Sequence, residues 1–86
     1  MRASHILVSS KEQADAILAE ANALSFGTLA QQHSSCPSKA RGGDLGDFGP
    51  GQMVKPFEDA TQSTPVGSIS QPVQTQFGWH LIHRTA

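Results

Sequence analysis

Residues 4–8, Ser-His-Ile-Leu-Val, decide how the fold begins. Aliphatic and β-branched residues in such a run are typical of a strand buried in a sheet. Ser10 follows closely, and Gln13 stands three residues after it, which is the spacing of a capping box. We therefore expect a buried strand that passes almost directly into a helix beginning near Ser10.

Apolar residues after Ser10 recur at helical spacing and extend the predicted helix to Leu24. Its buried face would be formed by Ala14, Ile17, Leu18, Ala21 and Leu24. Ser25 can cap a second, shorter helix. The apolar face of that helix would be formed by Phe26, Leu29, Ala30 and His33.

The middle of the chain, residues 34–51, differs in composition because glycine, proline and small polar residues dominate it. We expect an ordered loop that contains a brief strand at Leu45–Phe48. Pro56 fits the first turn of a third helix, where its missing N–H leaves no hydrogen bond unmade. Phe57 and Ala60 would point inward from that helix.

The C-terminal part is expected to supply two further strands. Residues 69–73 form the first, and Pro72 within them favours a place at the sheet edge. Residues 78–85 form the last strand. This order of strands and helices predicts an α+β fold with a small, mostly antiparallel sheet.

Composition narrows the class of protein. The chain has 86 residues, 37% of them hydrophobic, with a net charge of -1, which predicts one domain over residues 1–86 with a thin core. Its charges form no basic stripe for nucleic acid. No apolar run reaches the ~18–20 residues of a membrane span, and no signal-peptide core follows Met1. The single cysteine, Cys36, cannot form an internal disulfide, so we expect a monomeric, cytoplasmic protein.

Four histidines and Cys36 raise the question of metal binding. His80 and His83 are three residues apart on a predicted strand, so they would point to opposite faces. His5 and Cys36 have no partner at a recognised zinc spacing, and no metal site is predicted. Cys36 could instead form a reactive pair with His5 or His80, or be a small buried packing residue.

Three further features allow both a structural and a functional interpretation. His5 and His80 lie in the apolar-rich runs of two predicted strands and could hydrogen-bond to each other, or be two unrelated histidines. The glycines of residues 41–49 lack the spacing of a phosphate-binding loop, and they favour positive φ and close backbone approach. Four apolar residues beside this loop could be ordinary core or a shallow apolar cup, namely Leu45, Met53, Phe57 and Phe77.

Five motifs together resemble those of the parvulin family of peptidyl-prolyl cis/trans isomerases, in the same order and spacing. They are residues 4–8, 33–38, 42–46, 51–57 and 75–82. The resemblance extends over essentially the whole chain. It implies an FKBP-like α+β fold, with a four-stranded antiparallel sheet surrounded by helices, and an enzyme that turns X–Pro peptide bonds without a cofactor.

The resemblance also assigns roles to individual residues. His5 and His80 correspond to the paired histidines at the floor of the family's site, Thr75 to the residue that fixes a tautomer, and Cys36 to the active-site cysteine. The pocket for the proline ring corresponds to Leu45, Met53 and Phe57, and Gln52 and Phe77 lie beside it. The implied partners are proline-containing peptides and flexible protein segments.

One departure from the family pattern concerns phosphate. Phosphate-directed parvulins have a long basic loop after the first strand, whereas here only Ser9, Ser10 and Lys11 follow Val8. A lone lysine is a poor phosphate clamp, so we predict no requirement for phosphate and an apolar or unrestricted residue before proline. A noncatalytic peptide-binding or chaperone module of the same fold is the alternative, and a thiol hydrolase ranks third.

Overall fold

The computed structural model describes residues 1–86, which form four strands, three α-helices and one 3-10 helix. Along the chain these are β1 (Arg2–Val8), α1 (Lys11–Glu20), α2 (Phe26–His33), η1 (the 3-10 helix, Pro37–Arg41), β2 (Asp44–Asp47), α3 (Lys55–Ser63), β3 (Val73–Thr75) and β4 (Gly78–Arg84). The predicted α+β class is confirmed. None of these helices is both long and apolar enough to span a membrane.

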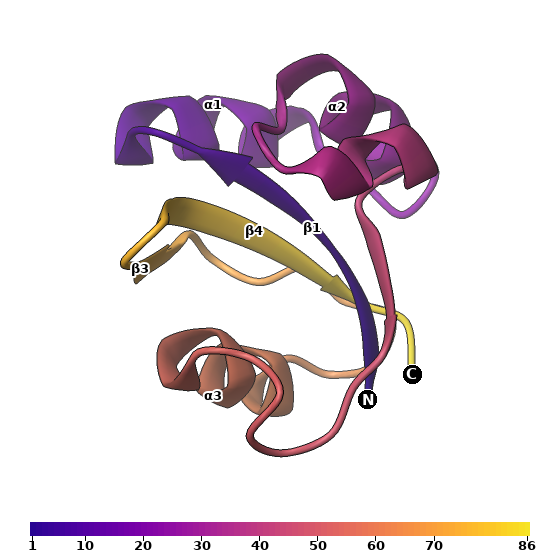
Figure 1. Cartoon of the computed structure of the whole chain (residues 1–86). Helices are drawn as coiled ribbons and strands as arrows, with labels where there is room; N and C mark the ends of the chain where they lie inside the picture. Colours follow the sequence, from indigo (N-terminus) through magenta and orange to yellow (C-terminus); the bar gives the residue numbers. More distant parts are fainter.

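The strands form one antiparallel sheet in the order β2-β1-β4-β3. The first and last long strands are thus neighbours at its centre, and the two chain ends lie side by side (Figure 1). In the register between β1 and β4, His5 lies opposite Ile82 and Leu7 opposite His80. His5 and His80 are therefore diagonal neighbours on one face of the sheet.

Helices cover both faces of the sheet (Figure 1). α1 and α2 lie over one face and pack against Ile6, Val8 and Leu81. α3 lies over the other face, where Phe57 packs with Ala3, Phe48 and Ile82. Because side chains alternate along a strand, each central strand contributes to both of these apolar clusters.

The first helix is shorter than predicted. α1 ends at Glu20, and Ala21 already has extended backbone angles. The side-chain oxygen of Asn22 accepts hydrogen bonds from the N–H groups of Leu24 and Ser25, which stabilises a turn in place of a further helical turn. The prediction that Leu24 is buried is therefore wrong, and this side chain is 96% exposed.

The second helix begins directly after Ser25, as predicted, but two of its details differ from the prediction. Ser25 makes no side-chain capping bond to α2, because its hydroxyl accepts the N–H of Asn22. His33 is exposed at the end of the helix, whereas Phe26, Leu29 and Ala30 are buried as predicted.

The strand predicted over residues 69–73 is also shorter. Only Val73–Thr75 pairs regularly with β4, while Ile69 makes an isolated bridge to His83. Pro72 lacks the N–H that a continuous ladder needs, so the strand begins after it. The predicted edge position is confirmed, since β3 is the last strand of the sheet.

Candidate active site

Two buried histidines from the central strands lie side by side under α3. The Nδ1 atoms of His5 and His80 are 3.0 Å apart, and their rings are nearly parallel, with centroids separated by 5.2 Å. This distance requires one Nδ1 to donate a hydrogen and the other to accept it. The interpretation of the two histidines as a mutual hydrogen-bonding pair is confirmed, and that of two unrelated histidines is wrong.

Thr75 anchors the other side of this pair. Its Oγ1 lies 2.7 Å from Nε2 of His80 and also accepts the backbone N–H of Phe77 at 3.1 Å. If His80 donates from Nε2 to Thr75, then its Nδ1 accepts from His5; if Thr75 donates to Nε2, then Nδ1 of His80 donates to His5. The Thr75 hydroxyl therefore couples directly to the tautomer of both rings.

One nitrogen of the pair has no partner in either arrangement. Nε2 of His5 is buried and makes no hydrogen bond. His5 and His80 are only 5% and 4% exposed. Burial, reinforced by the neighbouring His80, lowers the pKa of His5 from 6.5 to about 4. Burial likewise lowers the pKa of His80 to about 4, so both rings are neutral at pH 7.

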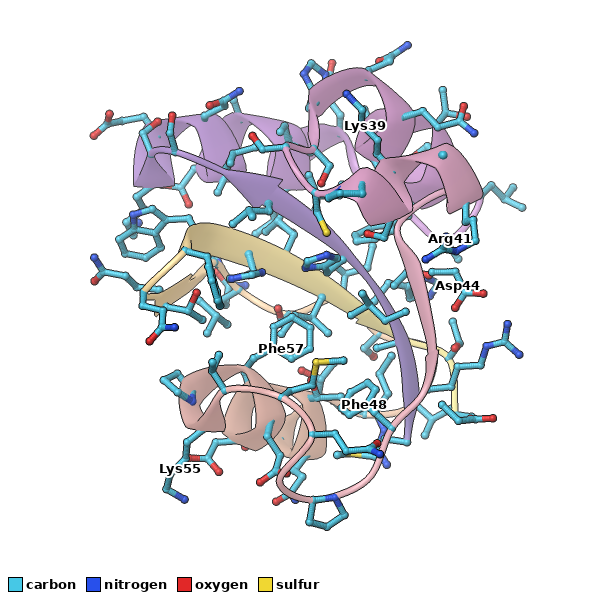
Figure 2. The ribbon with its side chains drawn as sticks, viewed as in Figure 1. Lys39, Arg41, Asp44, Phe48, Lys55 and Phe57 are labelled. Atoms are coloured by element: carbon cyan, nitrogen blue, oxygen red, sulfur yellow. The ribbon has the colours of Figure 1, made fainter.

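Phe57 stands over both histidines. Its ring meets His5 and His80 edge to face, with centroid separations of 5.6 and 5.2 Å. Figure 2 shows Phe57 pointing from α3 toward the sheet. The aromatic ring and the neutral imidazoles form one continuous wall, in an arrangement that aromatic rings favour.

An apolar cleft of about 510 Å³ opens above this wall. It is lined by eight of the nine residues that the sequence assigned to the site, namely His5, Cys36, Leu45, Gln52, Met53, Phe57, Phe77 and His80. Thr75, the ninth, does not line the cleft but hydrogen-bonds to two residues that do, His80 and Phe77. The shallow apolar cup suggested by the sequence is therefore present.

Four further lining residues were missed by the sequence analysis, namely Leu7, Ser35, Pro37 and Val54. Strand alternation could have identified Leu7, because it shares a face with His5 two residues away. The other three are neighbours in sequence of assigned residues and have no signal of their own. Met53 lies in the loop before α3, whereas Phe57 lies on α3, and both side chains line the cleft.

Cys36 is half-buried at one wall of the cleft. Its backbone N–H donates to the hydroxyl of Ser34 at 3.3 Å, and the same hydroxyl accepts the N–H of Leu7 in β1. No hydrogen bond joins its Sγ to His5 or His80, so the structure contains no cysteine–histidine pair. Neither sequence interpretation is fully correct, because the thiol is neither paired with histidine nor buried in the core.

The glycine-rich segment brings the wall of the cleft close to β1. Gly43 has a φ of +83°, and a Cβ at this position would overlap the carbonyl of His5. The Gly43 carbonyl accepts the N–H of His5 at 2.9 Å. Positive φ and close backbone approach, the structural role predicted for these glycines, are confirmed here.

The rim that contains Gln52 is held by two side chains. Oε1 of Gln52 accepts the N–H of Gly49 at 2.7 Å, and Oε1 of Glu58 accepts that of Gly51, also at 2.7 Å. These bonds fix the loop from which Met53 enters the cleft. The acceptor atom of Gln52 is thus occupied within the protein, which leaves its amide N–H₂ to meet a ligand.

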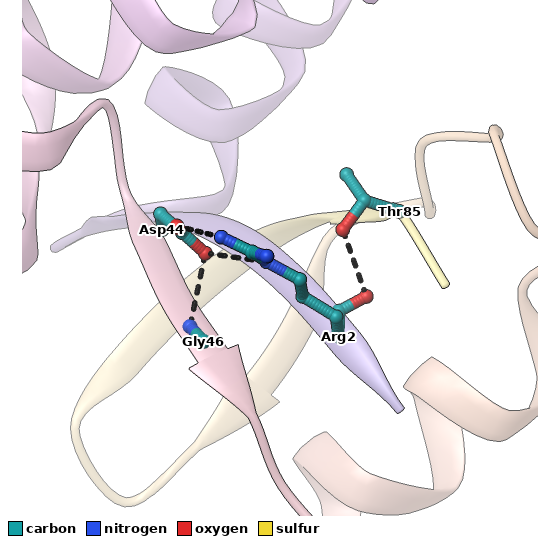
Figure 3. A network of polar contacts seen from close by, with 4 residues as sticks. All are labelled: Arg2, Asp44, Gly46 and Thr85. Atoms are coloured by element: carbon teal, nitrogen blue, oxygen red, sulfur yellow. Dashed lines mark hydrogen bonds and ion pairs between the residues drawn. The ribbon is translucent and has the colours of Figure 1, made fainter.

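An ion pair outside the cleft ties β2 to β1 (Figure 3). Nη2 of Arg2 lies 2.7 Å from Oδ2 of Asp44, whose Oδ1 accepts the N–H of Gly46. The hydrogen bond from Arg2, followed by that from Gly46, lowers the pKa of Asp44. The pair is solvent-accessible, so we assign it the role of positioning β2, which contains Leu45, rather than chemistry.

Comparison with protein families gives one match over almost the whole chain. Residues 5–86 match the family model described as "Rotamase: PPIC-type PPIASE domain". The foldase protein PrsA of Geobacillus sp. (strain WCH70) is 48% identical over 87 residues, covering 99% of this chain and 32% of that protein. A Pin1 peptidyl-prolyl cis-trans isomerase from Rhizopus delemar is 48% identical over 91 residues, covering 99% of this chain and 60% of that protein.

Solved structures agree with these matches. The PrsA structure from Bacillus anthracis superposes with a TM-score of 0.93 at 43% identity, covering 100% of this chain and 41% of that one. The parvulin NmPin of Nitrosopumilus maritimus superposes with a TM-score of 0.85 at 42% identity, covering 100% of this chain and 95% of that one. The chain spans about a third of the length of the Geobacillus and Bacillus cereus foldases that it matches (32% and 31%).

Proposed function

Because the chain belongs to the parvulin, or PPIC-type, family of peptidyl-prolyl isomerases, we propose that it accelerates cis/trans exchange of X–Pro bonds without requiring phosphate. The observation that supports this best is the apolar cleft bounded on one side by a neutral pair of histidines. An X–Pro segment needs such a site, since one end of it is an apolar ring and the other a polar amide.

The chemical problem is rotation about a bond with partial double-bond character. The barrier is ~18–20 kcal/mol, and uncatalysed exchange takes tens to hundreds of seconds. Lowering the barrier by about 5 kcal/mol shortens exchange to the millisecond range. No bond is made or broken, so the protein has only to bind the twisted amide more tightly than either planar isomer.

The lining residues suit this task. Leu45, Met53 and Phe57 would hold the proline ring while the preceding carbonyl turns over the histidines. A cleft that excludes water disfavours the planar amide, which is the more polar form. The Cys36 thiol and the imidazole rings are polar groups in fixed positions that can face the moving carbonyl oxygen.

A noncovalent role for Cys36 follows from the same geometry. A nucleophilic thiol needs a base within hydrogen-bonding reach, and neither histidine makes such a bond to Sγ. Both histidines are instead engaged with each other or with Thr75. We therefore assign Cys36 an electrostatic and packing role at the wall of the cleft.

The absence of a phosphate requirement is supported by where the cations lie. None of the lining residues is lysine or arginine. Lys11, the first cation after β1, pairs with Asp15 at 3.0 Å. Lys39 lies in the upper helical layer of Figure 2 and Lys55 at its lower margin, both away from Phe57. A phosphate before proline would therefore meet no cluster of cations in the cleft.

The natural substrates that we propose are flexible, proline-containing segments of folding proteins. Relatives named foldase support this choice, as does a cleft that is open to a peptide. We also propose that the chain acts as a monomer in a reducing compartment, consistent with its single cysteine. Sedimentation equilibrium at micromolar concentration tests the monomer, and a dimer mass would contradict it.

The test of the activity is exchange spectroscopy on a short, unphosphorylated X–Pro peptide. Wild type should raise the exchange rate far above background, and Phe57→Ala should lower kcat/KM by about 100-fold, because a buried aromatic contact contributes a few kcal/mol. Leu24→Ala, an exposed leucine outside the cleft, is the matched control and should retain wild-type activity. Phe57→Leu provides a milder variant if Phe57→Ala unfolds.

Two results would contradict the proposal. Exchange at the background rate with wild type would exclude the isomerase, and binding of the peptide without faster exchange would indicate a noncatalytic module. Phosphorylating a serine before proline should give no gain in rate. A gain of tenfold or more would contradict the phosphate-independent part alone.

A further inference from the structure

We propose that Phe77 selects the residue that precedes proline and favours a large apolar side chain there. This inference rests on the proposed function only in that the cleft must hold an X–Pro segment. Phe77 is one of three large hydrophobic residues that are strongly exposed, together with Leu24 and Val66. Phe77 alone among them lines the cleft, with 62% of its surface accessible.

Phe77 is linked to His80 through Thr75, whereas Phe57 contacts His80 directly through its ring. The Phe57 ring is 5.2 Å from the His80 ring, whose Nε2 is 2.7 Å from Thr75 Oγ1. That oxygen in turn accepts the backbone N–H of Phe77 at 3.1 Å. His80 is thus connected to two aromatic residues of the cleft, the buried Phe57 of α3 and the exposed Phe77.

The position of Phe77 is fixed by the fold. Thr75 pairs with Gly78, so residues 76 and 77 form the two-residue turn between β3 and β4. The bond from Phe77 to Thr75 closes this turn onto the histidine pair. An exposed aromatic ring on a fixed backbone provides apolar contact at little further cost in conformational entropy.

The direction of a bound peptide follows from the position of the proline ring. With the ring against Phe57 and Met53, the bond that turns starts at the ring nitrogen and lies over the histidines. The carbonyl and Cα at its other end belong to the preceding residue. We place its side chain toward Phe77, which lines the cleft together with Leu7.

The size and chemistry of the cleft agree with this assignment. A volume of about 510 Å³ lies within the ~300–1,000 Å³ of sites that enclose drug-sized ligands, which leaves room for a neighbour of the proline ring. No lysine, arginine, aspartate or glutamate lines it. A charged side chain before proline would lose water without gaining a partner, whereas an apolar one would remove Phe77 from water.

The test compares peptides that differ only in the residue before proline, with alanine, leucine, phenylalanine or glutamate there. Both kcat/KM and Kd are measured for each peptide. Wild type should prefer leucine over alanine by about tenfold, the lower end of what one apolar contact gives. In Phe77→Ala this ratio should fall to about twofold or less.

Gln76→Ala is the matched control, because Gln76 is the exposed partner of Phe77 in the same turn and does not line the cleft. It should keep the tenfold ratio. Phe77→Lys tests the chemistry in the opposite direction, and its preference for glutamate relative to leucine should rise about tenfold over wild type.

Two outcomes would overturn the inference. They are an equal loss for all peptides in Phe77→Ala, or an unchanged ratio of leucine to alanine in that variant. Failure of the proposed function gives a different result. Binding that still discriminates between peptides through Phe77, without any faster exchange, would remove the isomerase but retain this specificity residue.

Discussion

The two faces of the sheet are made by the same strands, yet they are used differently. Under α1 and α2, Ile6, Val8 and Leu81 are fully enclosed with Phe26 in a closed apolar cluster. Under α3, the alternate residues of the same strands include His5 and His80, and this face is left open as a cleft. In a small domain, one closed face has to provide much of the stability that the open face gives up.

The difference shows how a chain with little apolar material accommodates a binding site. Leu45 and Met53 contact the second apolar cluster only at its edge and also line the cleft. Three of the four imidazole nitrogens on that face are hydrogen-bonded in the chain from His5 through His80 to Thr75, and only Nε2 of His5 has no partner. The predictions below test whether stability and activity are divided between the two faces in this way.

The largest effect is expected from replacing a buried phenylalanine by alanine, first on one face of the sheet and then on the other. Phe26→Ala should lower the free energy of unfolding by about 3–5 kcal/mol, because the closed cluster cannot refill the cavity. Phe57→Ala should lower the free energy of unfolding less than Phe26→Ala does. It should lower kcat/KM more, because the Phe57 ring adjoins the cleft. Urea unfolding monitored by circular dichroism measures both. Equal losses of stability in the two variants would contradict the division between faces.

Lowering the pH should reduce the free energy of unfolding mainly through the open face, which contains His5 and His80. Unfolded histidines bind a proton near pH 6.5, whereas His5 and His80 in the native protein do so only near pH 4. As pH falls from 6.5 to 4, the unfolded state takes up protons that the native state does not, so the free energy of unfolding falls. At ~1.4 kcal/mol per pKa unit, we expect a loss of roughly 2–3 kcal/mol for each of the two histidines.

Urea unfolding at several pH values between 4 and 7 measures this loss. His33→Gln, which removes an exposed histidine at the end of α2, should keep the same profile. Stability that is constant from pH 6.5 to 4 would contradict a neutral, buried histidine pair.

A smaller effect is expected from Thr75, which anchors the histidine pair. Thr75→Val keeps the shape of the side chain but removes the oxygen that contacts His80 and the N–H of Phe77. Losing a buried hydrogen-bond partner costs about 1–3 kcal/mol, and we expect kcat/KM to fall about tenfold. Thr75→Ser should restore the activity. If Thr75→Ser were as impaired as Thr75→Val, the hydroxyl would not be the relevant group.

The smallest effect is expected at Cys36. Cys36→Ser should change kcat/KM by no more than about threefold, because no covalent step is proposed and a hydroxyl also presents a polar hydrogen to the cleft. Exchange spectroscopy on the unphosphorylated peptide measures it. A loss of about 1,000-fold would indicate that Cys36 is an obligatory nucleophile.

Local patterns in the sequence predicted much of the fold, and the errors share one cause. Strand alternation correctly placed His80 and His83 on opposite faces, and helical spacing identified Ala14 and Ile17 as buried. Leu24 fitted the same spacing, but Asn22 ends the helical path through side-chain bonds that periodicity does not detect. The 3-10 helix Pro37–Arg41 was missed because such short turns have no periodic pattern.

The candidate site shows the same limit. The resemblance to parvulins named most of the residues that line the cleft, whereas local reasoning left His5 and His80 as either partners or unrelated histidines. They are 75 residues apart in the sequence, and only the pairing of β1 with β4 determines their distance of 3.0 Å. No local pattern contains that register, because it depends on how the first and last strands meet.

The sequence by itself determined the class of fold, the family and the identity of the side chains available to a site. Each of these depends on residue type and short spacing, which are present in the chain before it folds. The tertiary structure alone decided that one sheet face is closed and the other open, that two histidines share a hydrogen and are neutral, and that Phe77 stands exposed beside them. These properties depend on burial and on long-range distances, which exist only once the strands have paired.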